Sequence, residues 1–167
     1  LKALALLKEK DSQAPLFHAL IVGDGARRGP LEEQVAQLGL REQVHFTGFR
    51  ADAEVLMKGF DIFCLASLSE GLSSAILAAM ACRLPIVSTE VGGIPELVVD
   101  GETGFLVRPA DPAALAQALG GLLADPALRV AYGEAGRRRI EKYFTIEKKL
   151  ESTERAYRKL LTEKGLR

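Results

Sequence analysis

The chain has 167 residues, of which 48% are apolar and 26% charged, as is typical of a globular protein with a full-sized core. Its 22 Lys and Arg balance its 22 Asp and Glu, so no broad basic surface for nucleic acid or anionic lipid is expected. We expect no signal peptide, and the sequence contains no apolar run of membrane-spanning length; it starts at a leucine inside a helical pattern. We expect one domain over residues 1–167, trimmed at its N-terminus.

Apolar periodicity, turn residues and helix caps divide the chain into alternating helices and short strands. The expected strands are 15–22, 44–47, 62–65, 85–88 and 105–107. The expected helices are 1–10, one from Pro30 to a stop at Gly39, 52–60, 74–82, 94–98, 111–124, 126–142 and one capped by Thr145. This alternation predicts an α/β fold with a doubly wound parallel sheet. Ligands bind such sheets at the carboxyl ends of the strands, so the candidate loops are 23–29, 48–52, 67–74 and 89–94.

Several side chains have expected structural roles. Asp111 and Asp125, each followed by proline, should cap two helices. Ile146, Leu150, Tyr157 and Leu161 recur at helical spacing and predict the apolar stripe of the last helix, whose remaining face is charged. The simplest interpretation of Arg137-Arg138-Arg139 is a solvated helix face. His18 and His45 lie among apolar residues and are expected to be structural. Cys64 and Cys82 are expected to be buried free thiols in a reducing, cytoplasmic compartment.

The chain is organised around the stretch from Asp61 to Glu96. Its helix, 74–82, has almost no polar residue, which predicts burial on both sides. Ser73 or Ser74 is a natural cap for the start of that helix. Free N–H groups and the positive end of the helix dipole would make this point an anion site suited to phosphate, with the Glu70 carboxylate at its edge.

This stretch also carries a family pattern. SLSEGLSSAILAAMA is followed by LPIVSTEVGGIPE, with LIVGDG and VHFTGF upstream and DGETGFLV downstream. In order and spacing these blocks resemble the C-terminal donor-binding domain of glycosyltransferase family 4, the retaining nucleotide-sugar glycosyltransferases of the GT-B fold. The resemblance covers nearly the whole chain. It implies that the chain binds a nucleotide-sugar donor.

The resemblance assigns roles to particular positions. Glu70 would be the catalytic-site carboxylate that contacts hydroxyls of the donor hexose, the alternative being a solvated loop residue. The other donor-binding positions would hold the diphosphate (Gly71, Leu72, Ser73, Ser74 and Ala75), face the base (Phe49 and Arg50) or lie near the donor (Gly92 and Gly93). The 49–50 segment is equally well explained as a surface turn, and Gly92-Gly93 as a tight turn alone. The family requires no cofactor, and no metal-ligand cluster is visible in the sequence.

Two departures from the family pattern stand out. Position 78 usually carries a second glutamate that binds the nucleotide ribose, and here it is alanine. The family's first strand, with an Arg and a Lys that neutralise the diphosphate, would precede Leu1. We therefore expect an incomplete sheet with all strands parallel, in the order 44–47, 16–22, a gap, 62–66, 85–88 and 104–107.

By resemblance, the chain is the donor-binding half of a retaining, metal-independent glycosyltransferase whose acceptor is a glycan, a lipid-linked sugar or a small molecule. Its partner would be an N-terminal acceptor-binding domain, and any association with the inner membrane face would involve only that absent part. Two alternatives remain: a non-catalytic domain with a degenerate donor site, which Ala78 favours, or a sugar-nucleotide isomerase of GT-B architecture. On its own, the fragment is expected to be inactive.

Overall fold

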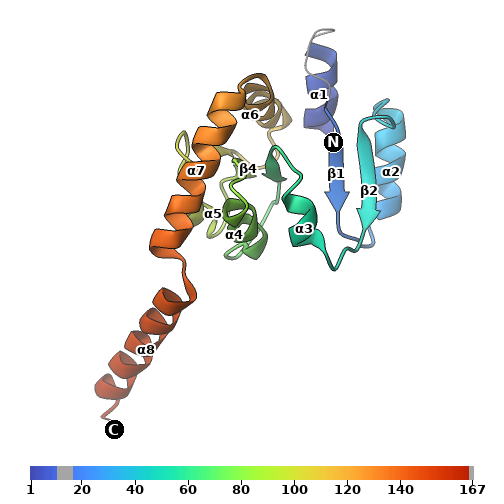
Figure 1. Ribbon diagram of the computed structural model, residues 1–167. Helices are drawn as coiled ribbons and strands as arrows, with labels where there is room; N and C mark the ends of the chain where they lie inside the picture. The colour runs from blue at the N-terminus through green and yellow to red at the C-terminus, as the bar shows by residue number, and fades with distance from the viewer. Residues whose placement is uncertain (11–16, 166–167) are drawn as a thin grey trace.

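The computed structural model describes residues 1–10 and 17–165, and its strands and helices alternate along the chain (Figure 1). The strands are β1 (Ala19–Val22), β2 (Val44–Gly48), β3 (Phe63–Leu65), β4 (Ile86–Thr89) and β5 (Gly104–Val107). The helices are α1 (Lys2–Lys10), α2 (Arg28–Gln37), α3 (Ala53–Met57), α4 (Ser74–Ala81), α5 (Ile94–Leu97), α6 (Pro112–Ala124), α7 (Pro126–Tyr143) and α8 (Ile146–Glu163). These elements follow the expected order, and residues 15 and 16 of the first expected strand lie outside the described part.

The strands form two parallel sheets. In one, β1 pairs with β2, and Ala19 lies opposite Val44. In the other, the order is β3-β4-β5, and Ile86 of β4 lies between Phe63 and Gly104. Figure 1 shows β1 between β2 and the three-stranded sheet. The predicted neighbours and parallel directions are thus confirmed within each sheet, and the break between the sheets falls where the family resemblance placed it.

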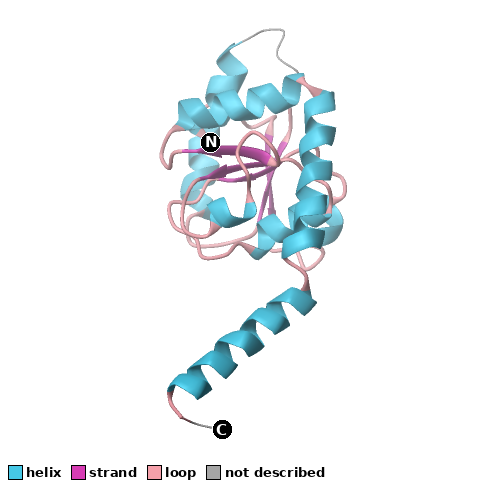
Figure 2. Cartoon of the chain, turned by 90° about the vertical axis from the view of Figure 1, so that its left-hand side faces the viewer, coloured by secondary structure: helices cyan, strands magenta, loops and turns pink. Residues whose placement is uncertain are grey.

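Helix α1 packs against both halves of the fold. Its Ala3 and Leu7 are buried in the apolar cluster that contains Val87 of β4. Its Ala5 is buried in a second cluster with Val44 of β2. Because the sheets share no hydrogen-bonded strand pair among the described residues, this apolar packing is a principal link between them. Figure 2 shows the helices arranged around the strands.

The unit β3–α4–β4 is the centre of the fold. In α4, Ile76, Ala79 and Met80 are completely buried, and all four residues of β4 are buried as well. Ser73 caps the helix by accepting a hydrogen bond from the Ile76 N–H at 3.4 Å. The position of the α4 N-terminus is therefore fixed by the core, as the apolar sequence of this helix predicted.

Helices α6 and α7 begin as the sequence indicated. The Asp111 carboxylate accepts hydrogen bonds from the N–H groups of Ala113 and Ala114, and Asp125 accepts one from Leu128. Each aspartate is followed by a proline at the first helical position, where a missing N–H costs nothing. Both predicted caps are confirmed.

The arginine run in α7 was interpreted wrongly from the sequence. Arg138 is exposed, but the two flanking arginines reach across to other helices. Arg137 donates to the Ala81 carbonyl at the end of α4 (2.9 Å), and Arg139 donates to the Leu97 carbonyl at the end of α5 (2.8 Å). Carbonyls at helix C-termini lack partners within their own helix and accept such bonds readily.

Helix α8 extends away from the rest of the fold (Figures 1 and 2). Its predicted stripe is apolar, but it is not a core face: Ile146 is 72% exposed and Tyr157 is 65% exposed. None of its described residues is buried. Helical spacing identified the stripe correctly, but periodicity alone does not provide a surface for it to pack against.

Two further expectations need correction. Helix α2 begins at Arg28, so Pro30 is its third residue; proline is tolerated there because N–H groups in the first turn have no acceptor within the helix. Cys64 and Cys82 are free thiols, but Cys64 is exposed and Cys82 only half-buried, because a short strand beside a break in the sheet is incompletely covered.

Within residues 1–10 and 17–165, no helix combines the length and apolarity needed to cross a bilayer.

Candidate active site

The first turn of α4 provides free backbone donors at the carboxyl end of β3. Ser74 and Ala75 are its first two residues, and no acceptor exists for their N–H groups within the helix. The next N–H, that of Ile76, already donates to the Ser73 side chain. Gly71, Leu72 and Ser74 are exposed and Ala75 is half-buried. Four of the five predicted diphosphate-binding residues thus form one accessible turn around the buried Ser73 cap, and its donors and dipole favour an anion.

Glu70 precedes this turn and is held by a neighbour. The Ser67 hydroxyl donates a hydrogen bond to Glu70 Oε1 at 2.8 Å, and the glutamate is half-buried. The segment 65–67 is in turn attached to β4. Ser88 donates to the Leu65 carbonyl at 2.8 Å, and Thr89 donates to the Ser67 carbonyl at 2.6 Å. The Glu70 carboxylate therefore lies on a loop whose backbone is hydrogen-bonded to β4.

Sequence reasoning missed the supporting roles of Ser67, Ser88 and Thr89. Ser67 lies only three residues before Glu70, so a contact between these two side chains within one loop could have been considered. The other two carried no comparable signal. Their hydroxyls reach across from β4 to the chain that leaves β3, and strand pairing of that kind appears only in three dimensions.

Gly92-Gly93 touches the Glu70 loop backbone to backbone. The Gly93 N–H donates to the Gly71 carbonyl at 3.1 Å. A Cβ at Gly92, whose φ is +54°, would lie 1.7 Å from the carbonyl oxygen of Glu70. Only glycine allows this approach, so two loops chosen from the sequence do meet at the carboxyl ends of β3 and β4.

The Phe49-Arg50 turn lies at the end of β2, in the other sheet. Phe49 is 81% exposed. Arg50 forms a two-pronged ion pair with Asp52, with nitrogen–oxygen distances of 2.7 and 2.6 Å, and the hydrogen bond from Arg50 lowers the pKa of the Asp52 carboxyl. The turn therefore exposes the Phe49 ring and an Arg50 guanidinium whose position is fixed by Asp52. No contact among the described residues links this turn to Glu70.

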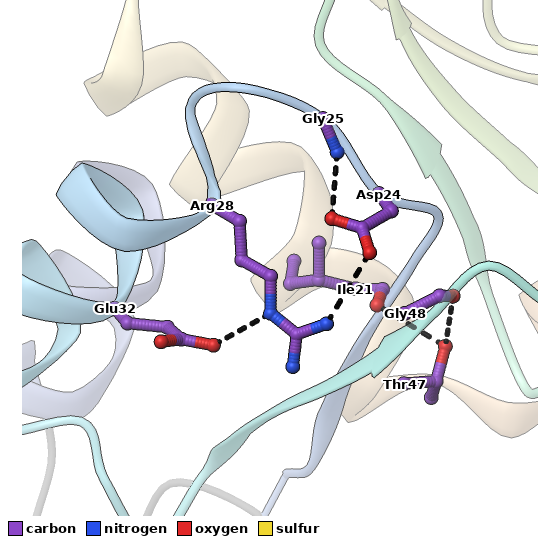
Figure 3. Close-up of polar contacts among 7 residues, drawn as sticks. All are labelled: Ile21, Asp24, Gly25, Arg28, Glu32, Thr47 and Gly48. Carbon is purple, nitrogen blue, oxygen red and sulfur yellow. Dashed lines mark hydrogen bonds and ion pairs between the residues drawn. The ribbon is translucent and has the colours of Figure 1, made fainter.

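The ends of β1 and β2 are joined by a polar cluster (Figure 3). Arg28 lies between Asp24, at 3.6 Å, and Glu32, at 2.8 Å. Its guanidinium occupies the space beside Gly48, where an added Cβ would lie 3.1 Å from the nitrogen. Thr47 donates to the Gly48 carbonyl at 3.1 Å, and this cluster supports the turn that carries Phe49.

An open hollow of about 460 Å³ lies beside β2, away from Glu70. Its lining includes Arg28, Glu32, Arg41 and His45. Two of these charges, Arg28 and Glu32, already neutralise each other, so the hollow offers less unpaired charge to a ligand than its composition suggests. On chemical grounds the α4 N-terminus, with aligned donors and a nearby carboxylate, is the better candidate site.

Ala78, the position of the family's second glutamate, lies one turn after Ser74 on the same side of α4. It is half-buried and packs against the apolar cluster that contains Ile76 and Met80. In the part of the chain that the structure describes, no three His, Cys, Asp or Glu side chains gather as metal ligands would. The site thus consists of backbone donors, one carboxylate and small residues.

The family described as "Glycosyl transferases group 1" matches residues 1–139, most of the chain and all of the site above. The chain belongs to this family. Among curated relatives, it is 34% identical over 131 residues to the lipopolysaccharide core biosynthesis mannosyltransferase LpcC of Rhizobium leguminosarum bv. viciae, and this alignment covers 78% of the chain and 37% of the relative. The chain therefore spans little more than a third of that mannosyltransferase.

Solved structures confirm the fold. Anabaena HepE in complex with UDP superposes with a TM-score of 0.82 at 28% identity, over 93% of this chain and 43% of HepE. The C-terminal domain of the group 1 protein LpcC from Francisella tularensis superposes with a TM-score of 0.76 at 31% identity, over 87% of this chain and 77% of that one. The predicted GT-B fold and the resemblance to its C-terminal domain are thereby confirmed.

Proposed function

We propose that this chain is the donor-binding half of a retaining glycosyltransferase that moves a sugar from a nucleotide sugar to a glycan, a lipid-linked sugar or a small acceptor. One observation carries the proposal: the free N–H groups at the start of α4 lie directly after Glu70, on a loop anchored to β4. Backbone donors suit a diphosphate, and a carboxylate suits sugar hydroxyls.

The reaction requires stabilisation of the charge that develops on the leaving diphosphate. The α4 N-terminus would supply fixed dipoles for that charge, and it would need no reorganisation because the core already holds the helix. Glu70, with one oxygen engaged by Ser67, would orient the sugar by accepting from its hydroxyls. Phe49 and Arg50 would border the base end of the donor.

The break between β1 and β3 fits a role as part of a larger protein. We infer that a strand from outside residues 1–167 lies between them and carries the Arg and Lys that the family places beside the diphosphate. An acceptor-binding domain would complete the cleft. By the same reasoning, a place on the cytoplasmic side of a membrane would depend on that domain.

Ala78 supports a second candidate, a domain of the same fold that has lost donor binding. An alanine methyl cannot accept a hydrogen bond from the ribose hydroxyls. The carboxylate of Glu70, its serine partner and the glycine contact beneath it are all in place, and these favour the active enzyme.

The experiment is to incubate the complete protein with UDP- and GDP-sugars and candidate acceptors, and to detect glycosylated products by mass spectrometry. The enzyme should form a product with retained anomeric configuration, and Glu70→Gln should lower turnover by about tenfold or more, because a charged acceptor becomes neutral. Ser69→Ala, an exposed change one residue away, should leave turnover nearly unchanged. Neither binding nor turnover of any nucleotide sugar would instead support the domain that has lost donor binding.

A further inference from the structure

Arg139 of α7 holds the short helix that lies under the candidate site. Its Nε donates to the Leu97 carbonyl and its terminal nitrogen donates to the Glu96 carbonyl, both at 2.8 Å. These two carbonyls belong to the last residues of α5. The guanidinium therefore caps this helix with two hydrogen bonds from one rigid, planar group.

Helix α5 depends on such external contacts because it has only four residues, Ile94–Leu97. One helical turn is not stable by itself, since fixing its backbone costs more than its few internal hydrogen bonds return. The buried side chains of Ile94 and Leu97 hold one side of α5. Arg139 holds its C-terminal end, where the carbonyls lack partners within the helix.

Movement of α5 would reach Glu70 through backbone alone. Gly93 is the residue that caps α5, and its N–H donates to the Gly71 carbonyl. Gly92 lies against the Glu70 carbonyl so closely that a single added methyl would overlap it. No flexible side chain separates the two loops here, so a shift at the start of α5 displaces the main chain of Glu70 and Gly71.

Arg139 is itself well fixed. Its guanidinium carbon lies 5.4 Å from the ring centre of Tyr143 and 5.8 Å from that of Phe144. Helix α7 is held against the end of α4, because a Cβ at Gly133 would lie only 2.0 Å from the Arg83 carbonyl oxygen. The same helix thus fixes both α4, which presents the N–H groups, and α5, which supports the Glu70 loop.

We propose that Arg139 is a positioning residue for the candidate site. By clamping the C-terminus of α5, it keeps the Gly92-Gly93 turn under Glu70 and Gly71 and so keeps the carboxylate in register with the α4 N-terminus. The structural part of this inference is independent of ligand; only its consequence for sugar donors rests on the proposed function. Arg139 is not expected to touch a ligand, since it acts at the opposite end of α5.

The test is hydrogen–deuterium exchange by mass spectrometry on the complete protein, in the wild type, Arg139→Ala, Arg139→Lys and Arg138→Ala. Arg138 is the matched control, because it is adjacent, equally charged and exposed. Arg139→Ala should raise exchange about tenfold or more in peptides that cover 90–97 and 69–72, while peptides from β4 and β5 keep their protection. Arg139→Lys should give an intermediate result, since an ammonium cannot reproduce the planar fork. Arg138→Ala should match the wild type.

The inference is overturned if Arg139→Ala and Arg138→Ala exchange alike over 90–97, or if protection falls evenly across the whole fold. Should the alanine variant fail to fold, the lysine variant alone decides, and unchanged exchange over 90–97 then overturns the inference. Titration with UDP and with a UDP-sugar that the wild type binds is a second measurement. If the loop loosens but Arg139→Ala binds the UDP-sugar as tightly as the wild type, the positioning role is contradicted. If no variant binds either ligand while the exchange pattern appears, it is the proposed function that fails.

Discussion

The α-carbon of Gly92 lies so close to Glu70 that a Cβ built on it would be 1.7 Å from the Glu70 carbonyl oxygen. This contact joins the loop after β4 to the loop after β3. Two independent reasons therefore favour glycine at position 92. A side chain would collide with Glu70, and the φ of +54° is unfavourable for other residues. The candidate site therefore rests on a main-chain contact as much as on its side chains.

Gly92→Ala should destabilise the fold and displace Glu70. Gly101→Ala is the matched control, because Gly101 also has a positive φ, +72°, but an added Cβ there meets nothing within 4 Å. The control should lose roughly 1–2 kcal/mol from backbone strain alone. We expect Gly92→Ala to lose at least about 2 kcal/mol more in urea unfolding, because a loop must move. Equal losses in the two variants would show that the contact with Glu70 is unimportant for stability.

Ser73→Ala should remove the cap of α4 and lower the free energy of unfolding by about 1 kcal/mol. Ser74→Ala is the comparison, because that side chain is exposed and does not cap the helix. It should change stability by less than about 0.5 kcal/mol. Chemical denaturation of both variants measures the difference, and a larger loss for Ser74→Ala would reverse the assignment of the cap.

Cys64 should react slowly with thiol reagents although it has solvent-accessible surface. Desolvation by the surrounding protein raises the pKa of its thiol from 9.0 to about 11. The exposure of Cys64 would favour a fast reaction, whereas its raised pKa favours a slow one. We expect the pKa to determine the rate, because only the thiolate reacts. In a Cys82→Ser chain at pH 8, labelling by a disulfide reagent should be about 100-fold slower than in denaturant. Comparable rates would show that the thiol is fully solvated.

Ala78→Glu in the complete protein should tighten nucleoside diphosphate binding by about tenfold. The new side chain would point back toward the start of α4, and a carboxylate there could accept from the ribose hydroxyls. Ala78→Gln has nearly the same shape without the charge and should gain less. Titration calorimetry with several nucleoside diphosphates makes the comparison. If the glutamate variant binds no more tightly, or unfolds because position 78 packs against the core, Ala78 is not a lost ribose contact.

The sequence predicted most of the architecture, because its signals are local. Aspartate followed by proline located the starts of α6 and α7, and the apolar segment after Ser73 located α4. What it missed depends on how distant segments meet. The hydrogen bonds from Arg139 to α5 and from Thr89 to Ser67 join residues that are 42 and 22 positions apart in the sequence. The residues around Arg139 and Thr89 contain no pattern from which these partners could be predicted. The stripe of α8 shows the opposite case, a correct pattern with no surface to pack on.

The most direct test of the central claim is an NMR titration of the complete protein, labelled with ¹⁵N on serine and valine, with UDP. The account predicts that the Ser73 and Ser74 amides shift most, because the diphosphate binds at the start of α4. Val35 and Val44, which line the hollow beside β2, should stay unchanged. Shifts at those two valines with none at Ser73 and Ser74 would contradict the account, because the nucleotide would then bind between α2 and β2.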